Sequence, residues 1–229
     1  MKVVDAVGHI LKNEGLEVAF GYPTTPLMES FAAVDIRTII CRQERTGVHM
    51  ADGFSRISNG KRLGVFVMQY GPGCENAFAG VATAFSDSSP LLVLPLGHIR
   101  DRAMVAPLFN SVTVFRPVTK WVENLTAPDQ ISNVMRRALS LVKNGRGGPV
   151  MVEIPDDIAS MDVPNLSIDS GSLPASKTPT EGSHFSLNVD KAKSLSTYSP
   201  VSTTRSAGSQ DDIEKAVKTL LKAQNPIII

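Results

Sequence analysis

Blocks of apolar and polar residues alternate along the first two thirds of the chain, and their period switches between helical and extended. Val3, Val7 and Ile10 fall on one helical face, which predicts an N-terminal helix that ends near Asn13 and Gly15. Short apolar runs then recur at residues 18–23, 37–41, 63–69, 90–97 and 150–155. Several of these runs are apolar on both faces, as expected for strands of a parallel sheet that is covered by helices on both sides.

Helical spacing occupies the stretches between these runs, at residues 27–33, 47–57, 71–88 and 131–142. In the second of them we expect Gly47, Met50, Ala51, Phe54 and Ile57 to form the inward face. Residues 98–118 are less regular. Strands and helices that alternate in this way predict an α/β fold with a largely parallel sheet over residues 1–159.

Composition changes after this domain. Residues 160–209 are rich in Ser, Thr, Pro and Gly, and we interpret them as a mobile linker. Residues 210–229 predict a helix capped by Asp211 or Asp212, with apolar positions that share a face, followed by a strand in "PIII". We expect this segment to be the truncated start of a second α/β domain.

Charge and cysteine content exclude several classes of protein. The 229 residues are 42% hydrophobic, and the formal net charge is +1. Basic residues are scattered, so we expect no nucleic-acid partner. Cys41 and Cys74 lie far apart in apolar or Gly-rich surroundings, which favours free thiols in a reducing compartment, and we expect a cytoplasmic protein. From the acidic residue and helical periodicity at the N-terminus we expect neither export nor membrane insertion.

Candidate chemistry gathers where three predicted strands end, in "GYPTTP", "RQE" and "QYGPGCEN". Ligands of open α/β sheets bind in crevices at these ends. Glu44 stands where a buried strand meets a helix, and the helix macrodipole alone favours an acidic residue there. The alternative is a buried carboxyl that transfers protons. Gly71 to Gly73 also have two interpretations. They form either a tight turn that starts a helix, or a surface that admits a flat ligand with Asn76 nearby.

The motifs together resemble a known family. "FGYP", "RQERTGVHMADGFSR", "GPGCENAFAGVATAFSDSSPLLVL", "FRPVTKW" and "GRGGPVMVEIPDDI" follow one another in the order found in the N-terminal pyrimidine-binding domain of thiamine-diphosphate-dependent enzymes, in the acetolactate synthase-like group. The resemblance spans residues 1–157, and residues 213–229 resemble the entrance to that family's central domain. It implies an enzyme that acts on 2-oxo acids, by decarboxylation with or without carboligation.

The resemblance also assigns roles to residues. It implies that Glu44 forms a hydrogen bond with a ring nitrogen of the cofactor's aminopyrimidine and promotes formation of the nucleophilic ylid. It places Tyr22 and Pro23, together with Gly71, Pro72, Gly73, Asn76 and Asn110, at the cofactor. It places Thr24, Thr25, His98 and Phe109 in the substrate pocket. Thr24 and Thr25 replace the usual Gly-Gly, and Asn110 replaces the usual glutamine, which puts the family's contact at that position in doubt.

Other parts of the family's site are missing from the chain. Family members bind the diphosphate through Mg²⁺ on a separate domain with a Gly-Asp-Gly motif, which this sequence lacks, and no metal ligand is expected here. A flavin, which many synthases of the group carry, would also lie mostly outside this chain. Because the cofactor lies between subunits, the resemblance implies a homo-oligomer.

Three explanations remain open for the missing parts: a fragment that is inactive by itself, a subunit of a split 2-oxo acid decarboxylase, and a non-catalytic α/β binding module.

Overall fold

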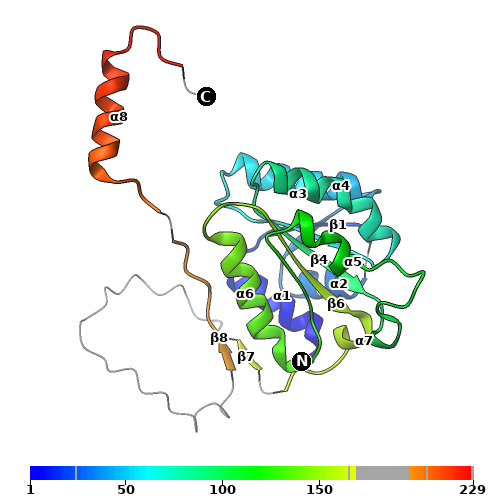
Figure 1. The fold of residues 1–229 in the computed structure, drawn as a ribbon. Coiled ribbons are helices and arrows are strands. Elements are labelled where there is room, and N and C mark those ends of the chain that lie inside the picture. Colours follow the sequence, from blue (N-terminus) through cyan, green and yellow to red (C-terminus); the bar gives the residue numbers. More distant parts are fainter. Residues whose placement is uncertain (24, 165, 169–195, 205, 228–229) are drawn as a thin grey trace.

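A twisted parallel sheet between two layers of helices forms the body of the computed structural model (Figure 1). The structure describes residues 1–23, 25–164, 166–168, 196–204 and 206–227. The strands of the main sheet are β1 (Val18–Gly21), β2 (Arg37–Ile40), β3 (Gly64–Met68), β4 (Leu91–Gly97), β5 (Trp121–Asn124) and β6 (Pro149–Pro155). Their order is β2-β1-β3-β4-β6-β5, and every described pairing is parallel. The predicted fold class is confirmed.

Helices connect these strands as the periodicity predicted. The helices of the body are α1 (Val3–Asn13), α2 (Thr25–Ala33), α3 (Glu44–Ile57), α4 (Pro72–Ser86), α5 (Ser111–Phe115), α6 (Ile131–Lys143) and α7 (Asp156–Ala159). Short 3-10 turns lie at Arg100–Arg102, Arg116–Val118 and Pro128–Gln130. The edge strand β5 was not anticipated, because only Val122 of its four residues is buried and the polar residues Glu123 and Asn124 interrupt its apolar pattern.

Alternate residues of the central strands face different helices. Val65 and Val67 of β3 pack in one apolar cluster with α1, α2, α6 and α7, whereas Phe66 and Met68 pack in another with α3, α4 and α5. Burial of both faces explains the continuous apolar runs, since a parallel sheet covered on both sides has no polar face.

The inward face of α3 differs from the prediction. Gly47 and Ala51 are buried, as predicted, but Met50 is 37% exposed and Ile57 is 92% exposed, and Val48, which was not in the predicted set, is fully buried. Gly80 of α4 leaves room for Val48, because a Cβ at Gly80 would clash with that side chain. The close contact between α3 and α4 therefore depends on a glycine.

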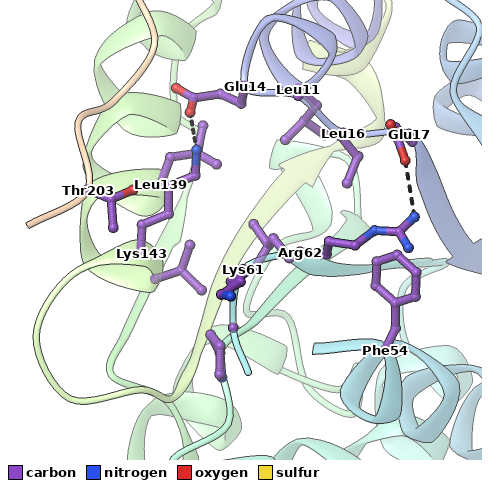
Figure 2. Close-up of a pocket in the computed structure, with 15 residues that line it drawn as sticks. Leu11, Glu14, Leu16, Glu17, Phe54, Lys61, Arg62, Leu139, Lys143 and Thr203 are labelled. Carbon is purple, nitrogen blue, oxygen red and sulfur yellow. Dashed lines mark hydrogen bonds and ion pairs between the residues drawn. The ribbon is translucent and has the colours of Figure 1, made fainter. Parts of the chain in front are cut away.

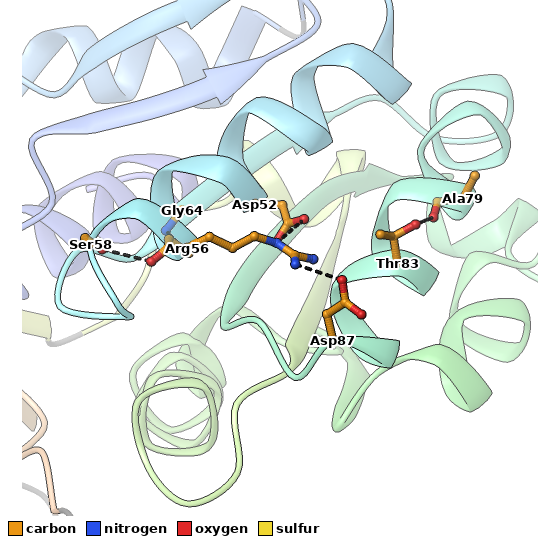
Figure 3. A network of polar contacts seen from close by, with 8 residues as sticks. Asp52, Arg56, Ser58, Gly64, Ala79, Thr83 and Asp87 are labelled. Carbon is orange, nitrogen blue, oxygen red and sulfur yellow. Dashed lines mark hydrogen bonds and ion pairs between the residues drawn. The ribbon is translucent and has the colours of Figure 1, made fainter. Parts of the chain in front are cut away.

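Polar side chains complete the same interface (Figure 3). Asp52 is only 4% exposed, and its carboxylate accepts two hydrogen bonds of 2.9 Å from Nε of Arg56. Arg56 also donates through Nη1 to Asp87, just after α4, at 2.7 Å. Buried Ser55 accepts a hydrogen bond of 2.7 Å from the backbone N–H of Gly64. The network ties α3 to α4 and to the start of β3.

The described ends of the predicted linker lie against the body. The N–H of Val163 donates to the carbonyl of Met1 at 2.9 Å. Tyr198 is fully buried and donates its hydroxyl to Glu14, which also accepts from the N–H of Val201 at 2.8 Å. A short parallel pair joins β7 (Leu166–Ile168) and β8 (Ser196–Tyr198). Residues 169–195 of the predicted linker are outside the described part.

The predicted C-terminal helix is α8 (Gln210–Lys222). Its N-cap is Ser209, so Asp211 and Asp212 lie in the first turn and the predicted capping role was wrong. The described residues of "PIII", 226 and 227, are not in a strand, and residues 228 and 229 lie outside the described part. Among the described helices, none has the length and apolar character needed to cross a bilayer.

Candidate active site

The loops that follow β1, β2 and β3 meet at the carboxyl edge of the sheet. The chain runs from β1 to β2 on one side and then continues with β3 on the other side of β1. Such a reversal of strand order opens a crevice between the diverging connections, which is where open α/β sheets bind ligands. Most of the predicted site residues come from these loops, whereas His98 follows β4, and Phe109 and Asn110 precede α5.

Glu44 is the first residue of α3 and is buried, with 4% of its surface exposed. Extended backbone at Gln43, the N-cap, turns the chain from β2 into the helix. Oε2 of Glu44 accepts a hydrogen bond of 3.1 Å from the side-chain amide of Asn76 in α4. Oε1 lies 3.4 Å from the position that a Cβ on Gly73 would occupy. The contacts thus fix one carboxylate oxygen and leave the other beside a glycine.

The Gly-Pro-Gly turn brings α4 to this carboxyl. Gly71 is the N-cap and has φ +57° and ψ −115°, a conformation that side chains rarely adopt. Pro72 follows at the first helical position, where its missing N–H costs no hydrogen bond. A Cβ on Gly73 would lie 3.0 Å from Cγ of Gln69. The tight-turn interpretation therefore holds, and the same turn also positions Gly73 against Glu44.

The loop after β1 is only partly described. The N–H of Tyr22 donates to the carbonyl of Val67 at 3.3 Å, and its half-buried ring packs on the α3–α4 side of the sheet. Pro23 is exposed. Thr24 lies outside the described residues, as does the side chain of Thr25 at the start of α2. Their predicted place in the substrate pocket stays a prediction.

His98, directly after β4, stacks on Tyr70 with ring centroids 4.4 Å apart and an interplanar angle of 37°. Nε2 of His98 is buried, has no hydrogen-bond partner among the described residues, and lies 4.0 Å from a Cβ built on Gly71. This places His98 beside the Gly-Pro-Gly turn, and its predicted place in the substrate pocket stays a prediction. The contribution of Tyr70 was missed, although an aromatic residue directly before that turn was a usable signal.

Phe109 and Asn110 approach the region from a different segment. Phe109 is half-buried on the same side of the sheet as α4. Oδ1 of Asn110 accepts a hydrogen bond of 3.0 Å from the N–H of Thr113 and so caps α5. That bond occupies the amide oxygen and leaves the amide nitrogen for a ligand. Within the described ranges, no hydrogen bond or ion pair joins either residue to Glu44.

A buried polar group at the same edge was missed. Glu153 of β6 is 9% exposed, accepts from the hydroxyl of Ser111, and accepts from Nδ2 of Asn124 at 3.2 Å. Burial raises the pKa of Glu153 to about 7. An acidic residue inside the apolar run "VMVEIP" was the signal for this group.

A separate cavity of about 580 Å³ lies at the amino-terminal ends of the strands, opposite the carboxyl ends (Figure 2). Arg62 lines it, pairs with Glu17 at 3.1 Å and lies over the ring of Phe54, 4.3 Å from its centroid. Lys143 lines it too, and forms an ion pair with Glu14. None of the predicted site residues lines this cavity, whereas Pro72 and Asn76 at the carboxyl edge are exposed. In the described chain, Pro72 and Asn76 thus form an open face next to the buried carboxyl of Glu44.

Metal-binding side chains do not cluster in the part of the chain that the structure describes: no group of three or more His, Cys, Asp or Glu residues could hold an ion there. The two cysteines are free. Burial raises the pKa of the Cys74 thiol, which disfavours its thiolate form.

Comparisons with known proteins agree with this geometry. Residues 1–110 match the model of the thiamine pyrophosphate enzyme N-terminal TPP binding domain. One relative is a probable acetolactate synthase large subunit of Methanocaldococcus jannaschii, with 30% identity in an alignment that covers 100% of this chain and 35% of the relative. Another is the acetolactate synthase isozyme 3 large subunit of Escherichia coli K12, with 31% identity over 95% of this chain and 34% of the relative. A third is the acetolactate synthase large subunit of Lactococcus lactis, with 34% identity over 72% of this chain and 29% of the relative.

The chain spans about a third of the length of the curated relatives that it matches. The family match covers the strands β1 to β4 and the helices α1 to α4, which carry Glu44, the Gly-Pro-Gly turn and Asn76. This part of the chain is therefore the N-terminal domain of a thiamine pyrophosphate enzyme, and it belongs to the acetolactate synthase-like group.

Proposed function

We propose that this chain supplies the aminopyrimidine-binding half of a thiamine-diphosphate site in an enzyme that acts on 2-oxo acids. The observation that carries the proposal is the Glu44 carboxyl: it is buried, its Oε2 is bonded to Asn76, and its Oε1 lies beside Gly73. These contacts hold a proton-transferring group in one orientation at a ligand-binding edge. The family match and the acetolactate synthase relatives support the choice of cofactor and substrate class.

The residues present fit a flat heteroaromatic ring. Gly73 has no side chain to block the approach to Oε1 of Glu44, and among the described residues, chain neighbours aside, only Nε2 of His98 lies within 4 Å of a Cβ built on Gly71. Tyr22 and Pro72 would border the ring, and Asn76 would keep the carboxyl turned toward it. The cofactor, when bound, supplies a thiazolium carbon that becomes a nucleophile toward the carbonyl of a 2-oxo acid.

Glu44 would hold or release a proton at the ring nitrogen that it faces. Burial excludes water from the carboxyl and strengthens its hydrogen bond to a ligand. Asn76 would orient the carboxyl through the 3.1 Å contact. Whether the enzyme decarboxylates or also joins two substrates depends on groups beyond these residues.

The organisation around this half-site is also part of the proposal. Residues 1–159 would be the pyrimidine-binding domain, 160–209 its connection, and 210–229 the start of the next domain. Mg²⁺ and the diphosphate would be held by polypeptide outside residues 1–229, in an oligomer that completes the site across subunits. The open face at Pro72 and Asn76 favours such a partner, because a cofactor bound there would otherwise remain in contact with water.

Calorimetric titration tests the half-site. The chain titrated alone with thiamine diphosphate and Mg²⁺ should bind weakly or not at all, and the chain combined with the diphosphate-binding polypeptide should bind tightly. The complemented Glu44→Gln variant should still bind, since only proton transfer is impaired. Tight binding by the isolated chain would contradict the half-site, and no binding in the complemented mixture would favour a non-catalytic module.

A further inference from the structure

A second buried carboxyl lies at the carboxyl edge of the sheet, apart from the Glu44–Asn76 pair. Glu153 of β6 stands opposite Asn124 in the register with β5. On its other side β4 ends at Gly97, where a Cβ would come within 2.8 Å of Cγ of Glu153. Glycine at this position therefore makes room for the acidic side chain between the strands.

Hydrogen bonds join this carboxyl to the start of α5. The hydroxyl of Ser111, the first residue of α5, donates to Oε2 of Glu153, and Nδ2 of Asn124 donates to Oε1 at 3.2 Å. Ser111 is 3% exposed, so its hydroxyl has little access to water. Asn110 caps the same helix, and Phe109 precedes the cap. Glu153 thus holds, through one bond, the segment to which the family assigns cofactor and substrate contacts.

The same cluster borders α4. Cys74 is fully buried; burial and then the charge of Glu153 raise the pKa of its thiol, whereas the hydroxyl of Ser111 lowers it. Cys74 directly follows Gly73, which lies against Glu44. Glu153 thus contacts the hydroxyl of Ser111 from α5, the amide of Asn124 from β5 and the backbone position of Gly97 in β4, and the thiol of Cys74 in α4 is a titratable group whose pKa its charge raises.

We propose that Glu153 is a positioning residue of the candidate site, which holds the start of α5 and with it the Phe109–Asn110 segment against the sheet, and whose protonation loosens or tightens that hold. Its meaning for catalysis rests on the proposed function. Glu153 acts through Ser111 and has no assigned contact with the cofactor.

Both protonation states of Glu153 find partners in the cluster. The ionised carboxylate accepts from Ser111 and Asn124. The neutral acid brings an O–H donor next to Asn124, whose Oδ1 is buried and has no partner among the described residues. Because burial raises the pKa of Glu153 to about 7, the two states exchange near neutral pH. Hydrogen bonds to an ionised group are roughly twice as strong as neutral ones, so the Ser111 bond should strengthen as pH rises.

Hydrogen exchange of the chain followed by mass spectrometry tests the positioning role without cofactor or substrate. After correction for the intrinsic pH dependence of exchange, peptides that cover residues 105–118 should become severalfold more protected between pH 6 and pH 8 in the wild type. Glu153→Gln, which keeps the shape of the side chain but cannot ionise, should abolish this change. Ser111→Ala should lower protection severalfold at pH 8. Glu123→Gln, on the neighbouring strand and paired with Arg137, should retain the wild-type profile.

A wild-type profile in Glu153→Gln, or unchanged protection in Ser111→Ala, would overturn the positioning role. Either outcome leaves the proposed function standing, because that function is tested by cofactor binding and by Glu44. In the complemented enzyme, Glu153→Gln should raise KM for the 2-oxo acid severalfold and flatten its pH dependence, while kcat changes less. A loss of kcat with unchanged KM would instead place Glu153 in the chemical step.

Discussion

The side-chain amide of Asn76 donates a 3.1 Å hydrogen bond to Oε2 of Glu44, which joins α4, one turn after its start, to the first residue of α3. The two residues belong to different helices, and the Gly-Pro-Gly turn at the start of α4 brings them together. The pair accounts for a carboxyl that is buried without an ion pair among the described residues, because the amide supplies a partner that carries no charge.

Removal of this partner should impair the site without unfolding the domain. We expect Asn76→Ala to slow cofactor activation in the complemented enzyme about tenfold, which corresponds to about 1.4 kcal/mol for the lost orientation of Glu44. Asn76→Asp should be slower still, since it places a like charge beside the carboxyl. Single-turnover kinetics at saturating cofactor would measure both. Equal rates in wild type and Asn76→Ala would show that Glu44 is oriented by other groups.

Two glycines within helices offer a matched test of the α3–α4 packing. Gly80→Ala forces a Cβ into Val48, and we expect it to lower the free energy of unfolding by about 1 to 3 kcal/mol. Gly53→Ala, in α3, has no heavy atom within 4 Å of its new Cβ, and we expect it to raise that free energy by about 0.5 to 1 kcal/mol. Urea denaturation of the chain measures both. Similar values for the two variants would contradict the close packing at Gly80.

The stability of the domain should depend on pH through Glu153. Burial raises the pKa of this carboxyl to about 7 from an ordinary value of 4.5, so the folded chain binds the proton more tightly than the unfolded chain between these two values. Its contribution to stability is therefore full below about pH 4.5 and is lost as the pH rises to about 7. Relative to Glu153→Gln, the wild type should lose on the order of 3 kcal/mol across this window. A difference between the two proteins that does not change with pH would contradict the assignment.

Much of the fold was predictable because parallel strands buried on both faces produce long apolar runs. Val65 to Met68 face both helical layers, so the run itself identifies the strand. The inward face of α3 was not predictable from hydrophobicity, because Gly80 lies in another helix and only the folded packing reveals the space that it leaves for Val48. Edge strand β5 is short and half-exposed, which weakens its pattern.

The candidate site, too, was predictable only in part from the sequence. Glu44 was identifiable from its place between a strand and a helix, together with the motif order that indicated the family. The partners of Glu153 were not, because Ser111, Asn124 and Gly97 come from separate segments that meet only in the sheet. Side-chain hydrogen bonds between distant segments leave no periodic signal in a sequence.

Hydrogen–deuterium exchange at the thiazolium carbon of bound thiamine diphosphate tests the role of Glu44 most directly. In the complemented enzyme, Glu44→Gln should slow this exchange about 10² to 10⁴-fold while the fold and cofactor binding persist, because the amide cannot take up and release the proton. Glu29→Gln, on the exposed side of α2, serves as the control and should exchange like the wild type. An exchange rate in Glu44→Gln equal to that of the wild type would contradict the assignment of this carboxyl as the proton-transferring group.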